Sequence, residues 1–317
     1  MSKKTNKSIN NDEPLALALS IKTSQSRPEP MTLKLFQLAF SIGGRLAPKI
    51  TSRFAYRLWL TSPRFKTPAS ERNALESAIV EYHPVKNHKI ATYIWGRTQQ
   101  TAKPAARPTI LLVHGWSGRG TQLGSFVEPL LDAGYRVLSF DAPAHGQSSG
   151  KQTTIFEIAD VTLALQKLYG EFDAVITHSF GGPCAALAVK NGLKIKRFVA
   201  ICPPATIRGL VTKFISTLHL TEKTCAYLIR HIEKSFGEHI WEDYSMSTLV
   251  STIDVTGFVI HDTNDIDIPW EEGQTVANAW HNAGIKITNG LGHRRILRDD
   301  EVIASVVNFI TGKKVTA

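Results

Sequence analysis

Short apolar runs alternate with helical stretches along the chain beyond Pro68. The runs are rich in Val, Ile and Leu, and most lie roughly 20 to 40 residues apart, which leaves room for a crossover helix. They occupy residues 109–113, 135–140, 174–177, 197–201, 257–261 and 285–288. Continuous apolar runs of this length are typical of strands buried on both faces of a sheet. The pattern therefore predicts an α/β fold with a mostly parallel central sheet flanked by helices.

Two segments depart from this alternation. Residues 78–82 and 89–95 lie close together and predict a hairpin ahead of the parallel strands. At about 204–254 the chain runs for roughly fifty residues without a predicted strand, although 207–218 and 224–236 have helical periods. We expect this insertion to form a small helical lid.

The segment before Pro68 is predicted to be a helical leader. Within residues 31–62 an apolar row repeats at every fourth position beside a basic row. Pro48 is expected in a first helical turn, and Pro63 ends the pattern. The apolar row is Leu46, Ile50, Phe54 and Leu58, and the basic row is Arg45, Lys49, Arg53 and Arg57. Two interpretations fit this pattern. Either the apolar row packs on the main domain with the basic row in solvent, or residues 31–60 contact an anionic lipid surface.

The predicted organisation has three parts. Residues 1–30 are rich in Ser, Asn, Lys and Pro, and we assign no structure to this basic tail. An amphipathic basic leader follows over 31–70, and a single α/β domain with its lid covers 71–317. No stretch reaches the roughly 20 apolar residues that span a bilayer, and the start lacks the apolar core of a secretory signal. We expect a cytoplasmic protein, peripheral to the inner face of the membrane if the leader binds lipid.

Charge and cysteine content narrow the classes of partner. The 317 residues carry a net charge of +10, of which +9 falls within residues 1–70. A nucleic-acid-binding domain carries its basic surface on the fold itself, so we expect no nucleic-acid partner. The three cysteines are far apart, which supports neither a disulfide framework nor a zinc site. Since no His, Asp or Glu cluster has ligand spacing, we predict no metal and no cofactor.

Candidate chemistry follows the predicted strands, because sites in open α/β sheets gather at the carboxyl ends of strands. After 174–177 comes the sequence H-S-F-G-G, which begins at His178 and leads into a helical run. A serine on such a turn is exposed, and its oxygen lies at a helix N-terminus that favours a developing negative charge. The motif reads T-H-S-F-G, with Thr177 where a small glycine is usual.

Three further loops carry polar residues at strand ends. The run 109–113 leads into His114, Gly115 and Trp116, where a second donor to an oxyanion would lie. The other loops contain FDAPAHGQS over 140–148, HDTNDIDIP over 261–269 and GLGHRRIL over 290–297.

Taken in order, LLVHGW, FDAPAHGQS, HSFGG, VIHDTNDIDIP and GLGHRRIL resemble the α/β-hydrolase superfamily over roughly residues 75–315. Within it, the chain looks most like bacterial serine hydrolases of esterase type with a basic helical leader. The order serine, acid, histidine matches that fold. The resemblance implies Ser179 as nucleophile, Asp265 as acid and His293 as base. It also implies backbone N–H groups of Trp116 and Phe180 as oxyanion donors.

Several residues near these motifs have supporting roles or compete for the catalytic ones. We interpret His114, Gly115, His178 and Gly181 as supporting residues, with the His178 side chain pointing away from Ser179. We interpret His145 and His261 as structural histidines. Of the rival acids, Asp262 stands where relatives usually have glycine, and Asp267 would point the other way.

The leading functional interpretation is a serine hydrolase that cleaves a carboxylic ester or thioester through an acyl-enzyme. A serine at the turn argues against dehalogenase and epoxide hydrolase chemistry, which need a carboxylate nucleophile. Acyl transfer to an alcohol or thiol acceptor is the alternative, and a non-catalytic binding protein on the same fold is a third. Apolar lid residues suggest a small-molecule substrate with an apolar acyl group. They are Leu210, Ile215, Leu218, Leu220 and Leu228.

Overall fold

The computed structural model describes residues 30–96 and 107–313, so the predicted basic tail lies outside the described residues except for Pro30. The chain divides into two compact units. We call Met1–Tyr56 with Arg208–Glu238 the helical unit, and Arg57–Ile207 with His239–Ala317 the sheet unit.

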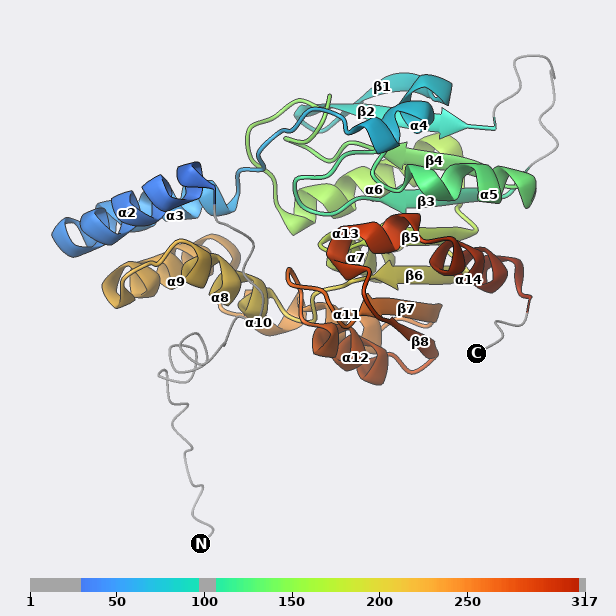
Figure 1. Cartoon of the computed structure of the whole chain (residues 1–317). Helices are drawn as coiled ribbons and strands as arrows, with labels where there is room; N and C mark the ends of the chain where they lie inside the picture. The colour runs from blue at the N-terminus through green and yellow to red at the C-terminus, as the bar shows by residue number, and fades with distance from the viewer. Residues whose placement is uncertain (1–29, 97–106, 314–317) are drawn as a thin grey trace, which may run out of the picture. The chain divides into compact units, whose positions relative to one another are not determined.

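The sheet unit is built on a single mixed sheet (Figure 1), whose order among the described residues is β1-β2-β4-β3-β5-β6-β7-β8. The strands are β1 (Ile79–Val85), β2 (His88–Trp95), β3 (Thr109–Val113), β4 (Arg136–Phe140), β5 (Ala174–His178), β6 (Arg197–Ile201), β7 (Thr256–Asp262) and β8 (Ala283–Thr288). β1 and β2 form an antiparallel hairpin, β2 is antiparallel to β4, and the remaining pairs are parallel. The predicted α/β class with a mostly parallel sheet is confirmed.

Helices connect the strands and cover the sheet. They are α4 (Arg72–Ser77), α5 (Val127–Asp132), α6 (Ile155–Tyr169), α7 (Gly181–Lys190), α10 (Ile240–Asp243), α11 (Met246–Ser251), α12 (Trp270–Ala279), α13 (Gly292–Arg295) and α14 (Asp300–Thr311). Short 3-10 turns occupy Ala69–Glu71, Gly124–Phe126 and Ile296–Arg298. Side chains cap two of the long helices: Thr154 accepts from the Glu157 amide and Asp299 from the Val302 amide.

Both faces of the central strands are buried, which explains their continuous apolar runs. Successive side chains of a strand point to opposite faces. Val199 and its neighbour across the ladder, Phe258, share a face with α14, where the rings of Phe258 and Phe309 lie 5.2 Å apart. Phe198 points to the other face and meets Trp280, at the end of α12, with a 5.1 Å ring separation.

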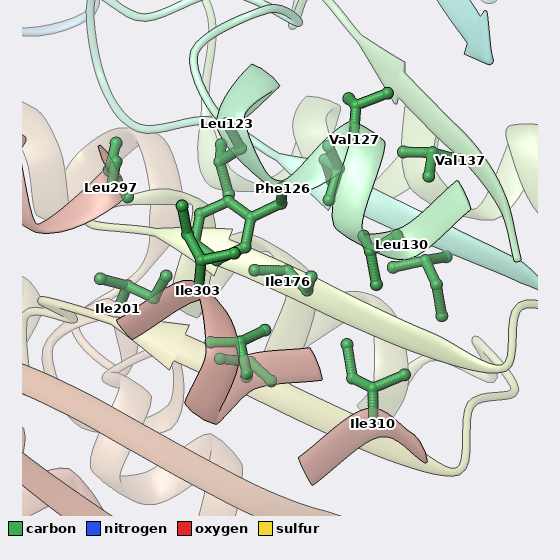
Figure 2. Close-up of a cluster of buried hydrophobic side chains, with 14 of the residues drawn as sticks. Leu123, Phe126, Val127, Leu130, Val137, Ile176, Ile201, Leu297, Ile303 and Ile310 are labelled. Atoms are coloured by element: carbon green, nitrogen blue, oxygen red, sulfur yellow. The ribbon is translucent and has the colours of Figure 1, made fainter. Parts of the chain in front are cut away.

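The core on the α5 and α14 face centres on Phe126. Its side chain is fully buried. Figure 2 shows its ring among Leu123, Ile176 and Ile303, which come from a loop, β5 and α14. One aromatic ring therefore fills the space between the sheet and two covering helices.

The helical unit combines the leader with the insertion between β6 and β7. Its helices are α2 (Met31–Leu46), α3 (Pro48–Trp59), α8 (Ile207–Thr217) and α9 (Glu222–Phe236). The Gln37 amide donates to the Thr217 carbonyl at 3.1 Å, and the Thr221 hydroxyl donates to the Gly44 carbonyl at 3.2 Å. The leader thus packs on the insertion helices, but not through the predicted apolar row, because Leu46, Ile50 and Phe54 are exposed. Among the described residues, no helix is both long and apolar enough to cross a membrane.

The leader is two helices within the helical stretch predicted over 31–62, and Pro48, expected in a first helical turn, begins the second. Ala47 leaves the helical conformation at the end of α2, and Pro48 begins α3. Proline is well suited to a first helical turn because its missing N–H would have no partner there. The helical pattern continues across the break because the two helices are separated by one residue.

We predict that Phe126→Ala destabilises the sheet unit by about 3–5 kcal/mol, because truncation leaves a cavity in a packed core. Leu168→Ala is the matched control, since that side chain is 54% exposed on α6, and its effect should stay within about 0.5 kcal/mol. Chemical denaturation of both variants measures the two values. Equal losses of unfolding free energy would contradict the assignment of Phe126 to the centre of the core.

Candidate active site

Ser179, the predicted nucleophile, lies in the turn between β5 and α7. Its φ of 51° is in the left-handed region, which a non-glycine residue adopts at a cost and which is frequent at functional sites. Its amide donates to the Ile201 carbonyl of β6 at 2.9 Å, and its carbonyl accepts from the Gly182 amide at 2.9 Å. These backbone bonds hold the turn at the carboxyl end of the sheet.

Close backbone approach explains two glycines around this turn. A Cβ at Gly181 would lie 2.5 Å from the Val113 carbonyl oxygen, and one at Gly115 would lie 3.0 Å from the Cβ of Ser179. Thr177, the departure from the usual glycine, is fully buried and donates its hydroxyl to the Val199 carbonyl at 3.1 Å. The added bulk is therefore accommodated within β5, with its polar group satisfied.

Trp116 and Phe180, the predicted oxyanion donors, come from two neighbouring loops. Their rings meet edge to face with centroids 5.6 Å apart. Within the described part of the chain, neither backbone N–H donates to another residue. The next amide, that of Ser117, is occupied because it donates to His145 at 3.2 Å. Both N–H groups are therefore available to a bound group.

Two buried histidines hold the loop that carries Trp116. His114 Nδ1 donates to the Gly115 carbonyl at 2.7 Å, and its Nε2 accepts from the Ala142 amide at 3.0 Å. His145 likewise bonds the Pro143 carbonyl and the Ser117 amide. Burial lowers the pKa of His114 to about 4 and that of His145 to about 3, so both rings are neutral at physiological pH. Their structural role agrees with their position at the strand ends.

Asp265 and His293 are in direct contact. His293 Nδ1 lies 2.6 Å from Asp265 Oδ2, and the carboxylate is fully buried. The other oxygen, Oδ1, accepts from the amides of Asp267 and Ile268 at 2.8 and 2.9 Å. Burial acts to raise the pKa of Asp265, but hydrogen bonds from His261 and His293 outweigh it and hold the pKa well below its usual range. An ionised acid facing Nδ1 fixes the proton of His293 on that nitrogen.

His178 connects the serine turn to the histidine loop. His178 directly precedes Ser179 in the sequence. Its Nε2 lies 2.8 Å from the carbonyl oxygen of His293, and the imidazole rings of His178 and His293 are 4.6 Å apart. Because a carbonyl only accepts, Nε2 carries the proton. Among the described residues no hydrogen bond joins the Ser179 hydroxyl to His293, an arrangement common in unliganded active sites. His178 therefore ties the serine turn to the backbone of the histidine loop.

The family follows from comparison with known proteins. The sequence model of the alpha/beta hydrolase family matches residues 110–305. The chain belongs to the alpha/beta hydrolase family. This family assignment agrees with the resemblance found in the sequence motifs.

Individual relatives are more distant. The chain is 29% identical over 143 residues to the dihydrolipoyllysine-residue acetyltransferase component of the acetoin cleaving system of Cupriavidus necator, covering 44% of this chain. It is 28% identical over 128 residues to a serine hydrolase-like protein of Danio rerio, covering 39% of this chain. In both cases the chain spans 36% of the relative's length.

Solved structures share the fold. Esterase Pf2001 of Pyrococcus furiosus superposes with a TM-score of 0.59 and 21% identity, covering 80% of this chain and 99% of that one. Esterase RhEst1 from Rhodococcus sp. ECU1013 gives a TM-score of 0.56 and 18% identity, covering 75% and 100%. At this level of identity the likeness establishes the alpha/beta hydrolase fold.

The sequence interpretation missed that His261 contacts the predicted acid. Its Nε2 lies 3.3 Å from Asp265 Oδ2 and 3.0 Å from the Ile268 carbonyl, and the side chain is fully buried. A nitrogen that faces two acceptors must carry its proton, so His261 donates to both. Its position at the end of β7, four residues before Asp265, is the sequence signal for this contact.

Cys202 completes a cluster around this acid. Among the described residues, Cys202, His261 and Asp265 form the group whose ligand atoms, all within 4.8 Å of one another, could hold a metal ion. Burial and the neighbouring Asp265 charge raise the pKa of the Cys202 thiol, which opposes the thiolate form that metals bind. The same contacts are accounted for by hydrogen bonds to the carboxylate of this alpha/beta hydrolase.

Asp262, the rival acid, binds the backbone of the histidine loop. Its Oδ1 accepts from the amides of Gly292 and Asn264 at 2.8 and 2.9 Å. Its Oδ2 accepts from the Leu291 amide at 3.0 Å and from the Thr288 hydroxyl at 2.7 Å. The carboxylate is buried, and burial raises its pKa less than these hydrogen bonds lower it. Asp262 therefore ties the loop before His293 to the end of β7.

We predict that Asp262→Asn lowers the free energy of unfolding by about 1–3 kcal/mol at neutral pH. The side-chain NH₂ group of the new Asn would replace a carboxylate oxygen, so that a donor would face the backbone N–H groups that this oxygen accepts from. The folded-state pKa is lowered, so the ionised carboxylate stabilises the fold above the unfolded value of about 3.9. That contribution is lost as pH falls through the folded-state pKa. Denaturation of both proteins between pH 7 and pH 2 measures the difference.

Asp243→Asn, at an exposed aspartate of α10, is the matched control and should change stability by about 0.5 kcal/mol or less. A stability loss in Asp262→Asn that stayed constant down to the lowest pH would contradict an ionised Asp262.

Proposed function

We propose that this alpha/beta hydrolase is a serine hydrolase that cleaves a carboxylic ester or thioester through an acyl-enzyme on Ser179. The observation that carries the proposal is the 2.6 Å contact between His293 Nδ1 and the ionised Asp265, joined through His178 to a serine on a strained turn. With the proton on Nδ1 donated in a hydrogen bond to Asp265, His293 Nε2 keeps a lone pair that can take a proton.

In the proposed reaction, Ser179 Oγ attacks the carbonyl carbon of the substrate while its proton moves to His293 Nε2. The resulting imidazolium is stabilised by the Asp265 carboxylate. The tetrahedral oxyanion accepts hydrogen bonds from the Trp116 and Phe180 amides, each such donor being worth about 3–4 kcal/mol where it has been measured.

The intermediate collapses by breaking the bond to the alcohol or thiol, which leaves with the proton from His293. Water then attacks the acyl-enzyme carbonyl and gives its proton to His293. The acid departs, and Ser179 recovers its proton. Each step uses the same imidazole, first as base and then as acid.

The burial of the acid supports this assignment. An exposed carboxylate beside His293 would be screened by water, whereas Asp265 is enclosed and held by two backbone amides. Its lowered pKa keeps it ionised throughout the physiological pH range. His261 and Cys202 add donors to the same carboxylate and so oppose its rotation away from His293.

Acyl transfer to an alcohol or thiol is a second candidate. One relative, from Cupriavidus necator, is named as an acetyltransferase component, although the match spans 36% of its length. The same acyl-enzyme serves both reactions, and the acceptor that reaches it decides between them. Adding alcohol or thiol acceptors to an ester assay and quantifying the transferred product separates the two candidates.

We predict that a fluorophosphonate probe labels the folded protein at Ser179, whose oxygen displaces fluoride from phosphorus. Ser179→Ala removes that oxygen and should abolish labelling. Ser251→Ala, at an exposed serine of α11, is the matched control and should label like the wild type. Labelling is read by gel fluorescence and intact mass. Labelling that persists in Ser179→Ala, or its absence from folded wild-type protein, contradicts the proposal.

The proposed substrate is a small ester with an apolar acyl group, a proposal that rests on the sequence of the insertion alone. That sequence is rich in large apolar residues, which include Leu210, Ile215, Leu218, Leu220 and Leu228. We predict that kcat/KM for p-nitrophenyl esters rises with acyl chain length beyond acetate. Each CH₂ that becomes buried contributes about 0.8 kcal/mol, or roughly a fourfold increase. A profile in which acetate is the best substrate would contradict an apolar acyl site while leaving the nucleophile assignment standing.

A further inference from the structure

The α2 helix carries a row of exposed apolar side chains. Residues spaced by three or four positions lie on one face of a helix. The row is Met31, Leu35, Leu38, Ile42 and Leu46. Their exposed fractions run from 48% for Ile42 to 80% for Leu46. Contiguous exposed apolar patches are uncommon on soluble proteins and mark interaction sites.

This exposed row lies opposite the face that α2 buries. The buried residues are Gln37, Phe40 and Gly44, whose spacing puts them on the other side of the helix. Gln37 and Gly44 make the hydrogen bonds to Thr217 and to Thr221 described above. Packing within the helical unit therefore uses one side of α2 and leaves its most apolar side in solvent.

The α3 helix also exposes large apolar side chains, and basic side chains stand beside them. Ile50 and Phe54 are 56% and 60% exposed, and they stand beside the exposed basic residues Lys49 and Arg53. The buried side of α3 is formed by small residues, Thr51, Ser52 and Ala55. As on α2, part of the large apolar side chains is exposed, while Tyr56, Leu58 and Trp59 are half-buried.

The charge of this surface has one sign. Residues 30–70 contain no Asp or Glu, while Lys34 and Arg45 on α2 and Lys49 and Arg53 on α3 are all exposed. On α2, the spacing puts Lys34 and Arg45 next to the exposed apolar row. A face with apolar side chains in the middle and basic ones at its border fits a surface with an apolar interior and an anionic border.

We propose that α2 and α3 dock the protein on an anionic lipid surface. The exposed apolar side chains of α2 enter the boundary between headgroups and acyl chains, and the basic side chains pair with lipid phosphates. A nucleic acid would use the basic residues but not five aliphatic side chains. A second copy paired through this face would bring two surfaces of like charge together. An anionic lipid surface can bind both the apolar and the basic side chains of α2 and α3.

The test is co-sedimentation of the full-length protein with phosphatidylcholine vesicles that do or do not contain phosphatidylglycerol. We expect binding to the anionic vesicles, weaker binding to the neutral ones, and a decrease at high salt. Replacing Arg45, Lys49 and Arg53 by Gln should weaken binding by on the order of 100-fold, given the usual contribution of each basic residue near an anionic membrane.

A second variant removes apolar contact at constant charge. Leu38→Ser combined with Ile42→Ser should weaken binding to the same vesicles by about tenfold or more. The matched controls lie on the sheet unit, where Lys167→Gln with Lys190→Gln and Leu168→Ser change exposed residues of the same types. Controls should bind like the wild type, and circular dichroism and hydrolysis of a soluble ester should stay unchanged in every variant.

Three outcomes would overturn the proposal. The first is no binding of the wild type to anionic vesicles. The second is unchanged binding in the charge or the apolar variant, which would place the contact elsewhere on the chain. The third is concentration-dependent self-association without vesicles that Leu38→Ser with Ile42→Ser abolishes, which would identify a second copy as the occupant of this face.

Discussion

The Asp265 carboxylate is the group on which the arrangement of the candidate active site depends. It is enclosed, yet it stays ionised because imidazole and amide donors surround both oxygens. An isolated buried carboxylate would take up a proton instead, since desolvation disfavours its charge. Each donor that lowers the pKa of Asp265 also restricts its orientation. The electrostatic and geometric requirements of the acid are therefore met by the same contacts.

Asp262 and Asp265, at the end of β7 and in the loop that follows it, have different roles at the histidine loop. Asp265 faces the imidazole of His293, while Asp262, three residues earlier, binds the amides that lead to it. In the sequence they look like rivals for one role. In the structure they act on the side chain and on the backbone of the same histidine loop. A residue without a carboxylate at position 262 could not make these bonds.

The sequence predicted the central strands well, because a strand that is buried on both faces has a continuous run of apolar residues. The runs at 109–113 and 197–201 coincide with β3 and β6. Pro48 indicated a first helical turn, although the apolar period passes through the break at Ala47 unchanged. The contacts of Asp262 with Thr288, Leu291 and Gly292 could not be predicted from the sequence, because they depend on the pairing of β7 with β8, and local periodicity does not show which distant segments pair. The contact of His261 with Asp265 is local, and the four-residue spacing was its signal.

The origin of the helical unit has a consequence for how the chain folds during synthesis. Gln37 and its partner Thr217 are 180 residues apart, and the intervening segment supplies six strands of the sheet unit. The leader helices emerge from the ribosome early, but α8 and α9, on which they pack, are translated much later. Contacts between such distant segments form slowly, and apolar surface exposed in the meantime favours aggregation. The helices α2 and α3 are thus made before the helices on which they pack, and the helical unit cannot be completed until six strands of the sheet unit have been translated.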